Sequence, residues 1–132
     1  MPAEYAIVGY GVTDIGRVDE PHSLIEYETE AAARAIADAG LQRSDIGAAL
    51  QAVSDLSGSV RTRHDDAYAR VLGLPANVYI ENVGRGGEHT AMALIIAMKL
   101  LDLGIANYVL VAGARDDFSR SRRVKRAGGR GT

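Results

Sequence analysis

The sequence contains no cysteine, and this absence excludes several classes of protein. Without thiols there is no disulfide framework, no CxxC redox pair and no cysteine-ligated zinc site. Long apolar runs are also missing: residues 91–98 are followed by Lys99 and Asp102, and fall well short of the roughly 20 residues that a membrane-spanning helix needs. Residues 1–8 lack the basic start and long apolar stretch of a signal peptide. We therefore expect a soluble, cytoplasmic protein without a membrane span.

The formal net charge of -2 conceals an uneven distribution. Residues 1–113 hold 8 of the 15 basic and 15 of the 17 acidic residues, hence -7, whereas residues 114–132 hold 7 basic and 2 acidic residues, hence +5. The acidic body argues against nucleic acid as the main partner. Residues 119–132 lack apolar periodicity. We therefore predict one globular domain over residues 1–118 and a disordered basic tail over residues 119–132.

Strands and helices are predicted to alternate along the body of the chain. A content of 47% hydrophobic and 24% charged residues suits one domain with a single core. The predicted strands are residues 5–12, 46–53, 77–81 and 108–112, and the predicted helices are residues 24–39, 65–72 and 88–103, each followed by a glycine. This alternation predicts parallel pairing of the strands and a layered α/β architecture.

Two of the predicted helices carry more detailed expectations. The first begins with a capping box, Ser23 followed by Glu26, and ends before Gly40. Within it, Ile25, Ala32, Ile36 and Ala39 are expected to be buried, and Glu28, Arg34 and Asp38 are expected to be exposed. The helix over residues 88–103 has apolar side chains in nearly every direction, and is therefore expected to be enclosed by protein on most sides.

Two short motifs do not predict a site. Gly9-Tyr10-Gly11 starts like a dinucleotide-binding fingerprint, but Asp14 stands where the third glycine is needed. We expect these glycines to turn the chain out of a buried strand. His64-Asp65-Asp66 could suggest a metal, but adjacent side chains on a helix point away from one another, and no second cluster supplies further ligands. No metal site is predicted.

The segment from Asn82 to Thr90 joins a strand to the N-terminus of the apolar helix. Free backbone N–H groups and the positive end of the helix dipole make such a point suitable for a nucleophile or an oxyanion. Alternatively, Gly84, Gly86 and Gly87 only permit a tight turn. On the residues alone, both interpretations stay open.

This part of the sequence resembles the thiolase superfamily around its nucleophile. The shared order is a strand with an asparagine near its end, a glycine-containing loop, a long apolar helix that ends at Gly104 and a Val-Leu-Val-Ala-Gly strand. Counting back from Gly104, Gly87 occupies the position of the family's cysteine. The Gly86-Gly87 pair is similar to the paired glycines of cysteine-less members of the sterol-carrier-type, or nonspecific lipid-transfer, group. Residues 6–11, 39–41 and 45–46 are also similar to that group.

The resemblance covers about residues 5–118 and only the N-terminal half of the family's fold, so it implies a mostly parallel sheet and a buried central helix. It implies an acyl-CoA-associated protein of lipid metabolism, in which Arg85, Gly86 and Gly87 bind the substrate. No cofactor is expected, and acyl-CoA is the ligand that the resemblance implies. His89, with Glu88 as its orienting group, is the nearby candidate acid–base pair, and a purely structural role at the helix start is the alternative.

Catalysis is less clearly implied than fold. The family's second half supplies a histidine that activates the cysteine and a second cysteine that acts as acid and base, and no segment here matches either. Thiolysis or Claisen condensation is therefore not expected of this chain alone. Some cysteine-less relatives are aldolases or lyases that act on acyl-CoA thioesters, so the resemblance leaves residual turnover open.

Two alternatives compete with acyl-CoA binding. The first is a non-catalytic module that forms a homodimer through the strand Asn77–Glu81, or serves as a partner subunit of a thiolase-type acyltransferase or aldolase complex. The second is a shortened reading frame, because the basic Gly/Arg ending differs from the thiolase continuation after Gly113. In that case the body is expected to be poorly stable unless it dimerises.

Overall fold

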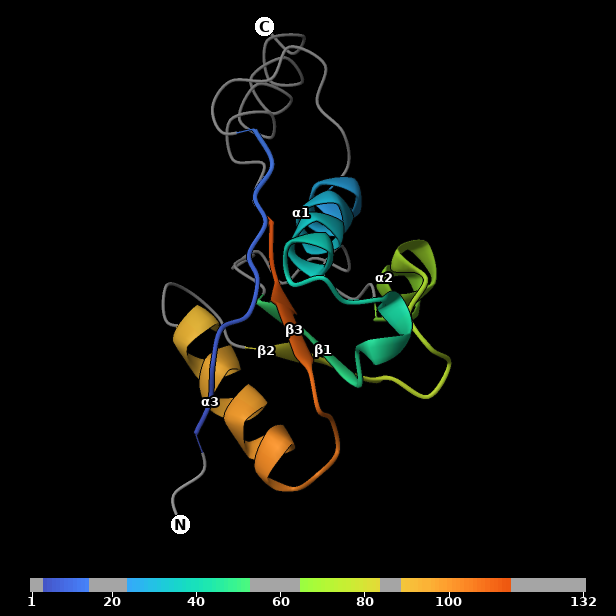
Figure 1. The fold of residues 1–132 in the computed structure, drawn as a ribbon. Coiled ribbons are helices and arrows are strands. Elements are labelled where there is room, and N and C mark those ends of the chain that lie inside the picture. The colour runs from blue at the N-terminus through green and yellow to red at the C-terminus, as the bar shows by residue number, and fades with distance from the viewer. Residues whose placement is uncertain (1–3, 15–23, 53–64, 84–88, 115–132) are drawn as a thin grey trace, which may run out of the picture.

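The computed structural model describes residues 4–14, 24–52, 65–83 and 89–114, with the backbone alone described for a few of them, including Asn82 and His89. Three strands, β1 (Ala48–Ala52), β2 (Tyr79–Val83) and β3 (Val109–Ala112), form a parallel sheet in the order β2-β1-β3 (Figure 1). The helices are α1 (Leu24–Asp38), α2 (Asp65–Leu72) and α3 (His89–Asp102), and a short 3-10 turn, η1, spans Arg43–Asp45. The predicted layered α/β architecture is confirmed.

The alternation of side chains along β1 divides the core into two layers. Ala49 packs with residues of α1 and α2, including Ala32, Ile36 and Leu72. Its neighbours Ala48 and Leu50 point the other way and pack with residues of α3. Helices α1 and α2 therefore cover one face of the sheet and α3 covers the other (Figure 1). The central strand is buried along its whole length.

All three helices end where glycine predicts. Gly40, Gly73 and Gly104 have φ of 70°, 76° and 70°, which is the left-handed region that glycine adopts without steric cost. After α1, the N–H of Leu41 donates to the carbonyl of Ile36 at 3.1 Å and that of Gly40 to Ala37 at 3.0 Å, which is a Schellman motif. The predicted ends of the helices are therefore confirmed to within a residue.

The prediction of a first strand over residues 5–12 is wrong. Residues 4–14 are not assigned to any strand, and the Ile7 side chain is 82% exposed. Gly9 and Gly11 instead allow this segment to approach α1 closely, because a Cβ at Gly11 would lie 2.4 Å from the carbonyl oxygen of Ala31. The N–H of Tyr10 donates to Asp38 at 3.0 Å, and the Tyr5 hydroxyl donates to Asp102 on α3. The segment is thus held by the two helices and not by a strand ladder.

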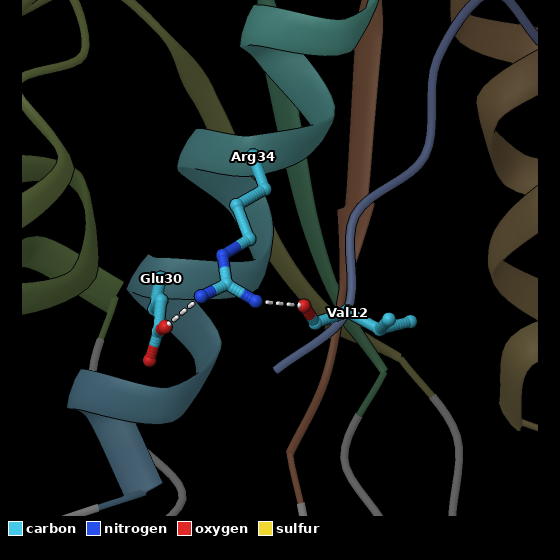
Figure 2. A network of polar contacts seen from close by, with 3 residues as sticks. All are labelled: Val12, Glu30 and Arg34. Atoms are coloured by element: carbon cyan, nitrogen blue, oxygen red, sulfur yellow. Dashed lines mark hydrogen bonds and ion pairs between the residues drawn. The ribbon is translucent and has the colours of Figure 1, made fainter. Parts of the chain in front are cut away.

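A polar network on the outer side of α1 completes this attachment (Figure 2). Arg34 donates from Nη1 to the carbonyl oxygen of Val12 and from Nη2 to Glu30 Oε1, each at 2.6 Å. Glu30 lies one turn earlier on the same helix, so the ion pair has the i, i+4 spacing that helices favour. One guanidinium therefore joins the N-terminal segment to α1.

Burial on α1 agrees with most of the predictions and contradicts one. Ala32 and Ile36 are buried and Arg34 and Asp38 are exposed, as predicted, while Ala39 is half-buried. The Ile25 side chain lies outside the described residues. Glu28, predicted to be exposed, is only 6% exposed. Its position explains this, because residue 28 precedes Ala32 by four and Ile36 by eight and therefore lies on the same stripe of the helix.

Other boundaries differ slightly from the prediction. β2 begins and ends two residues later than the predicted strand 77–81, so Asn82 belongs to the strand and not to the loop. β1 is shorter than the predicted 46–53, and Val53 lies outside the described residues. The described residues do not enclose α3 on most sides, since Met92, Leu94 and Ile95 are 44%, 42% and 47% exposed.

Residues 119–132, the predicted tail, lie outside the described residues, so the division at residue 118 stays a prediction. None of the helices in the described part of the chain is long and apolar enough to cross a membrane. The cytoplasmic location stays a prediction from the sequence.

Candidate functional site

The candidate site lies where β2 ends and α3 begins. β2 ends at Val83 and α3 starts at His89. The predicted substrate-binding residues Arg85, Gly86 and Gly87, and the predicted acid–base partner Glu88, lie outside the described residues. His89 is the first residue of α3, and its backbone alone is described. The structure therefore places the two elements that flank the predicted loop, and the roles of the five residues stay predictions.

Small side chains fix α3 against the sheet. Ala93, Ala97 and Leu100 are 0%, 8% and 6% exposed and pack on the face of the sheet that carries Leu50 and Val83. Alanine at two of these three positions lets the helix backbone come close to the strands. Because Val83 ends β2 at the carboxyl edge and α3 returns from there toward the start of β3, the N-terminus of α3 lies at the carboxyl edge of the sheet (Figure 1).

This arrangement favours negative charge at the start of α3. The first N–H groups of a helix have no partner within it, and the helix dipole places a partial positive charge there. The first turn of α3 contains no acidic residue. An oxyanion or the carbonyl oxygen of a thioester is the kind of group that such an N-terminus can hold. Parallel α/β sheets also bind ligands outside the carboxyl ends of their strands.

The strand before the site lies at the edge of the sheet. In the order β2-β1-β3, β2 pairs with β1 on one side, and no strand among the described residues lies on its other side. The N–H of Tyr79 donates to the carbonyl of Gly47 at 3.0 Å, so this group points toward β1. In a parallel ladder successive N–H groups alternate in direction, so the N–H of Ile80 points to the open side. The Tyr79 hydroxyl donates to Glu81 Oε2 at 3.0 Å.

Sequence reasoning missed one polar cluster, the buried contact between Glu28 on α1 and Gln51 on β1. Gln51 Nε2 donates to Glu28 Oε2 at 3.1 Å, and Gln51 is 2% exposed. The signal for Glu28 was its helical spacing from Ala32 and Ile36. Gln51 lies inside the strand predicted over residues 46–53, and nothing in the sequence marked its side chain as a partner for α1.

No family model matches the sequence. Individual proteins and solved structures do resemble it. A curated steroid side-chain-cleaving aldolase from Thermomonospora curvata is 29% identical over 119 residues, which are 90% of this chain and 29% of that protein. This chain therefore spans less than a third of the length of that relative.

Solved structures resemble the fold. The Ltp2-ChsH2(DUF35) aldolase superposes with a TM-score of 0.61 and 28% identity, over 80% of this chain and 26% of that chain. Xanthomonas campestris OleA, crystallised as a Cys→Ser variant with bound lauric acid and lauroyl-CoA, gives a TM-score of 0.59 and 20% identity over 72% of this chain and 28% of that chain. A Glu→Asp variant of OleA from the same organism superposes with a TM-score of 0.66 and 19% identity, over 80% of this chain and 32% of that chain. Together with the parallel sheet and the placement of α3, these likenesses show that this chain has a thiolase-like fold.

Proposed function

We propose that this chain is a thiolase-like, acyl-CoA-binding protein that lacks the nucleophilic cysteine, with Gly87 in its place. The observation that carries the proposal is the N-terminus of α3 at the carboxyl edge of the sheet, with no acidic residue in its first turn. Two kinds of neighbour support it: OleA was crystallised with lauroyl-CoA, and the relatives with the highest identity among those described above are aldolases. The helix start and Gly86-Gly87 would hold the thioester carbonyl, and Arg85 would meet an anionic part of the ligand.

The same proposal limits the chemistry. Without a thiol at residue 87, no acyl-enzyme forms there, so thiolysis and Claisen condensation are not assigned to this chain alone. His89, oriented by Glu88, is the proposed acid–base group for any proton transfer next to the bound thioester.

Calorimetric titration of the full chain with CoA and with acetoacetyl-CoA tests the proposal. We expect saturable heat with both ligands, and Arg85→Ala should raise Kd by roughly tenfold, since one charge-assisted contact is worth on the order of 1.4 kcal/mol. Lys99→Ala is the matched control, because Lys99 is an exposed basic residue in the last turn of α3, at the opposite end of the helix. Absence of both heat and a thermal shift at millimolar ligand would overturn the proposal.

The second candidate is an association module, which two described features favour. No described strand pairs with the outer side of β2, and α3 exposes Met92, Leu94 and Ile95. We propose that β2, predicted as the strand Asn77–Glu81 and observed at Tyr79–Val83, pairs with its counterpart in a second copy, or that a partner subunit of an acyltransferase or aldolase complex covers these surfaces. The name of the Ltp2-ChsH2 aldolase joins two components, which supports the second form of this proposal.

Native mass measurement tests the homodimer. The expected mass is twice the 14.0 kDa of one chain. Ile80→Pro should return it to the monomer value, because proline removes the N–H that points to the open side and leaves the ladder to β1 intact. Ile80→Ala shortens the side chain but keeps that N–H, and should still dimerise. A native chain that stays monomeric at micromolar concentration contradicts the homodimer.

A further inference from the structure

A buried carboxyl group with a neutral partner connects α1 to the central strand, and neither candidate function uses it. Glu28 is 6% exposed and Gln51 is 2% exposed. Gln51 Nε2 donates to Glu28 Oε2 at 3.1 Å, while Gln51 Oε1 is buried and has no hydrogen-bond partner in the described part of the chain. A buried amide oxygen that accepts no hydrogen bond is costly and rare, so this oxygen calls for an explanation.

Among the residues that the structure describes, no cation compensates Glu28, since its pKa is shifted by burial and by the hydrogen bond from Gln51. Gln51 lies opposite Asn82 of β2 and Ala112 of β3, and neither β1 nor β3 contains a titratable residue. α2 packs against α1, and among its described side chains the charged one is Arg70, which is exposed; the side chains of Asp65, Asp66 and Tyr68 lie outside the described part.

The other ionisable groups of α1 do not face Glu28 across this contact. Arg34 is engaged with Glu30 and Val12, and Asp38 accepts from the N–H of Tyr10. Glu26 is exposed and Tyr27 is half-buried. β2 contributes Tyr79 and Glu81, which bond to each other and lie, by the alternation along the strand, on the face of α3.

We propose that Glu28 and Gln51 form a proton-dependent contact that holds α1 on the sheet. When Glu28 is ionised, its carboxylate accepts from Gln51 Nε2, as observed, and Gln51 Oε1 stays unpaired. When Glu28 takes up a proton from solvent, the acid gains an O–H donor. The acid and the Gln51 amide can then form a cyclic pair, in which this O–H donates to Oε1 while Nε2 still donates to the carbonyl oxygen of the acid. The unpaired oxygen gains a hydrogen bond and Nε2 keeps its own.

The electrostatics agree with the geometry. Burial raises the pKa of Glu28 from 4.5 to about 7, and the hydrogen bond from Gln51 opposes the rise. Between these two pH values the folded chain keeps a proton that the unfolded chain has released. Stability from this group is therefore complete below about 4.5 and is lost as the pH rises through about 7. The contact should hold α1 more firmly in mildly acidic solution than in alkaline solution.

Urea unfolding of the full chain at a series of pH values from 5 to 8 tests the thermodynamic part. We expect the folding equilibrium constant to fall by between about 10- and 100-fold across this range. Glu28→Gln, which keeps the shape but cannot ionise, should remove this loss. Glu30→Gln is the matched control, since Glu30 is exposed one half-turn further along the same helix, and it should keep the native pH profile. A Glu28→Gln profile parallel to the native one overturns the proposal.

Nuclear magnetic resonance of the unmutated chain keeps the test independent of whether the variants fold. The carboxyl ¹³C shift of Glu28 should titrate near pH 7, and the side-chain amide ¹⁵N shift of Gln51 should move with the same midpoint. Titration of Glu28 near its ordinary value overturns the buried-acid contact. A Gln51 amide signal that does not follow Glu28 overturns the gain of the second hydrogen bond.

Discussion

The helices α1 and α3 pack on opposite faces of one sheet, and their outward sides differ in chemistry. Both present small apolar residues to the strands, such as Ala32 on α1 and Ala93 on α3. The outward side of α1 carries charged residues in hydrogen bonds, whereas that of α3 exposes apolar side chains of which Ile95 is 47% exposed. Water solvates the first surface well and the second poorly. We infer from this difference that α1 forms an outer layer, whereas further protein would pack most favourably on the outward side of α3.

The largest expected effects come from the leucines that lie beneath each helix. Leu50 faces α3 and Leu72 packs with α1, and both are fully buried at 0% and 1% exposure. Leu50→Ala and Leu72→Ala should each lower the free energy of unfolding by about 2–5 kcal/mol, because each removes buried methyl groups and leaves a cavity. Urea denaturation at fixed pH, with unchanged slope, measures both.

The ratio of the two losses in the free energy of unfolding tests whether the layers of α1 and α3 are equally cohesive. Equal losses mean that the α3 layer is as cohesive as the α1 layer in spite of its exposed outward side. A loss below about 1 kcal/mol for Leu50→Ala, beside a full loss for Leu72→Ala, would contradict this expectation and show that the surroundings of Leu50 collapse or loosen easily.

Local signals in the sequence predicted the fold well. The stops at Gly40, Gly73 and Gly104 depend on one backbone conformation that each residue adopts by itself, and the structure has all three. The parallel sheet follows from alternation of strands with helices, which is again a regular pattern along the chain. These features could be predicted because they depend on neighbours in sequence.

Features that depend on distant neighbours could not be predicted in the same way. Residues 5–12 have the composition of a strand, but a strand needs a ladder partner, and Gly9 and Gly11 instead bring this backbone against α1. Glu28 was predicted to be exposed because it is charged, although its spacing of four residues from Ala32 places it on the buried stripe of α1. For the candidate site, the sequence predicted a helix N-terminus at a sheet edge, which the structure shows, while the loop side chains lie outside the described residues.

The smallest expected effect lies on the outward side of α1. A double-mutant cycle with Glu30→Ala and Arg34→Ala should give a coupling of about 0.3–0.5 kcal/mol, because both partners of this i, i+4 pair are about half exposed, at 45% and 49% of their side chains. The coupling should shrink as salt is raised, since exposed charges are screened. Unfolding midpoints in urea at low and high salt measure it.

Arg34 has a second role that the cycle separates from the ion pair. Its bond to the carbonyl of Val12 does not involve Glu30, so Arg34→Ala alone should cost more than Glu30→Ala, by roughly the 0.5–1.5 kcal/mol of one hydrogen bond. Because this bond attaches residues 4–14 to α1, hydrogen exchange at the Tyr10 amide should quicken in Arg34→Ala and stay unchanged in Glu30→Ala. Equal exchange in the two variants would mean that Gly9, Gly11 and Asp38 hold the N-terminal segment without help, and that the charges on α1 serve only its contact with water.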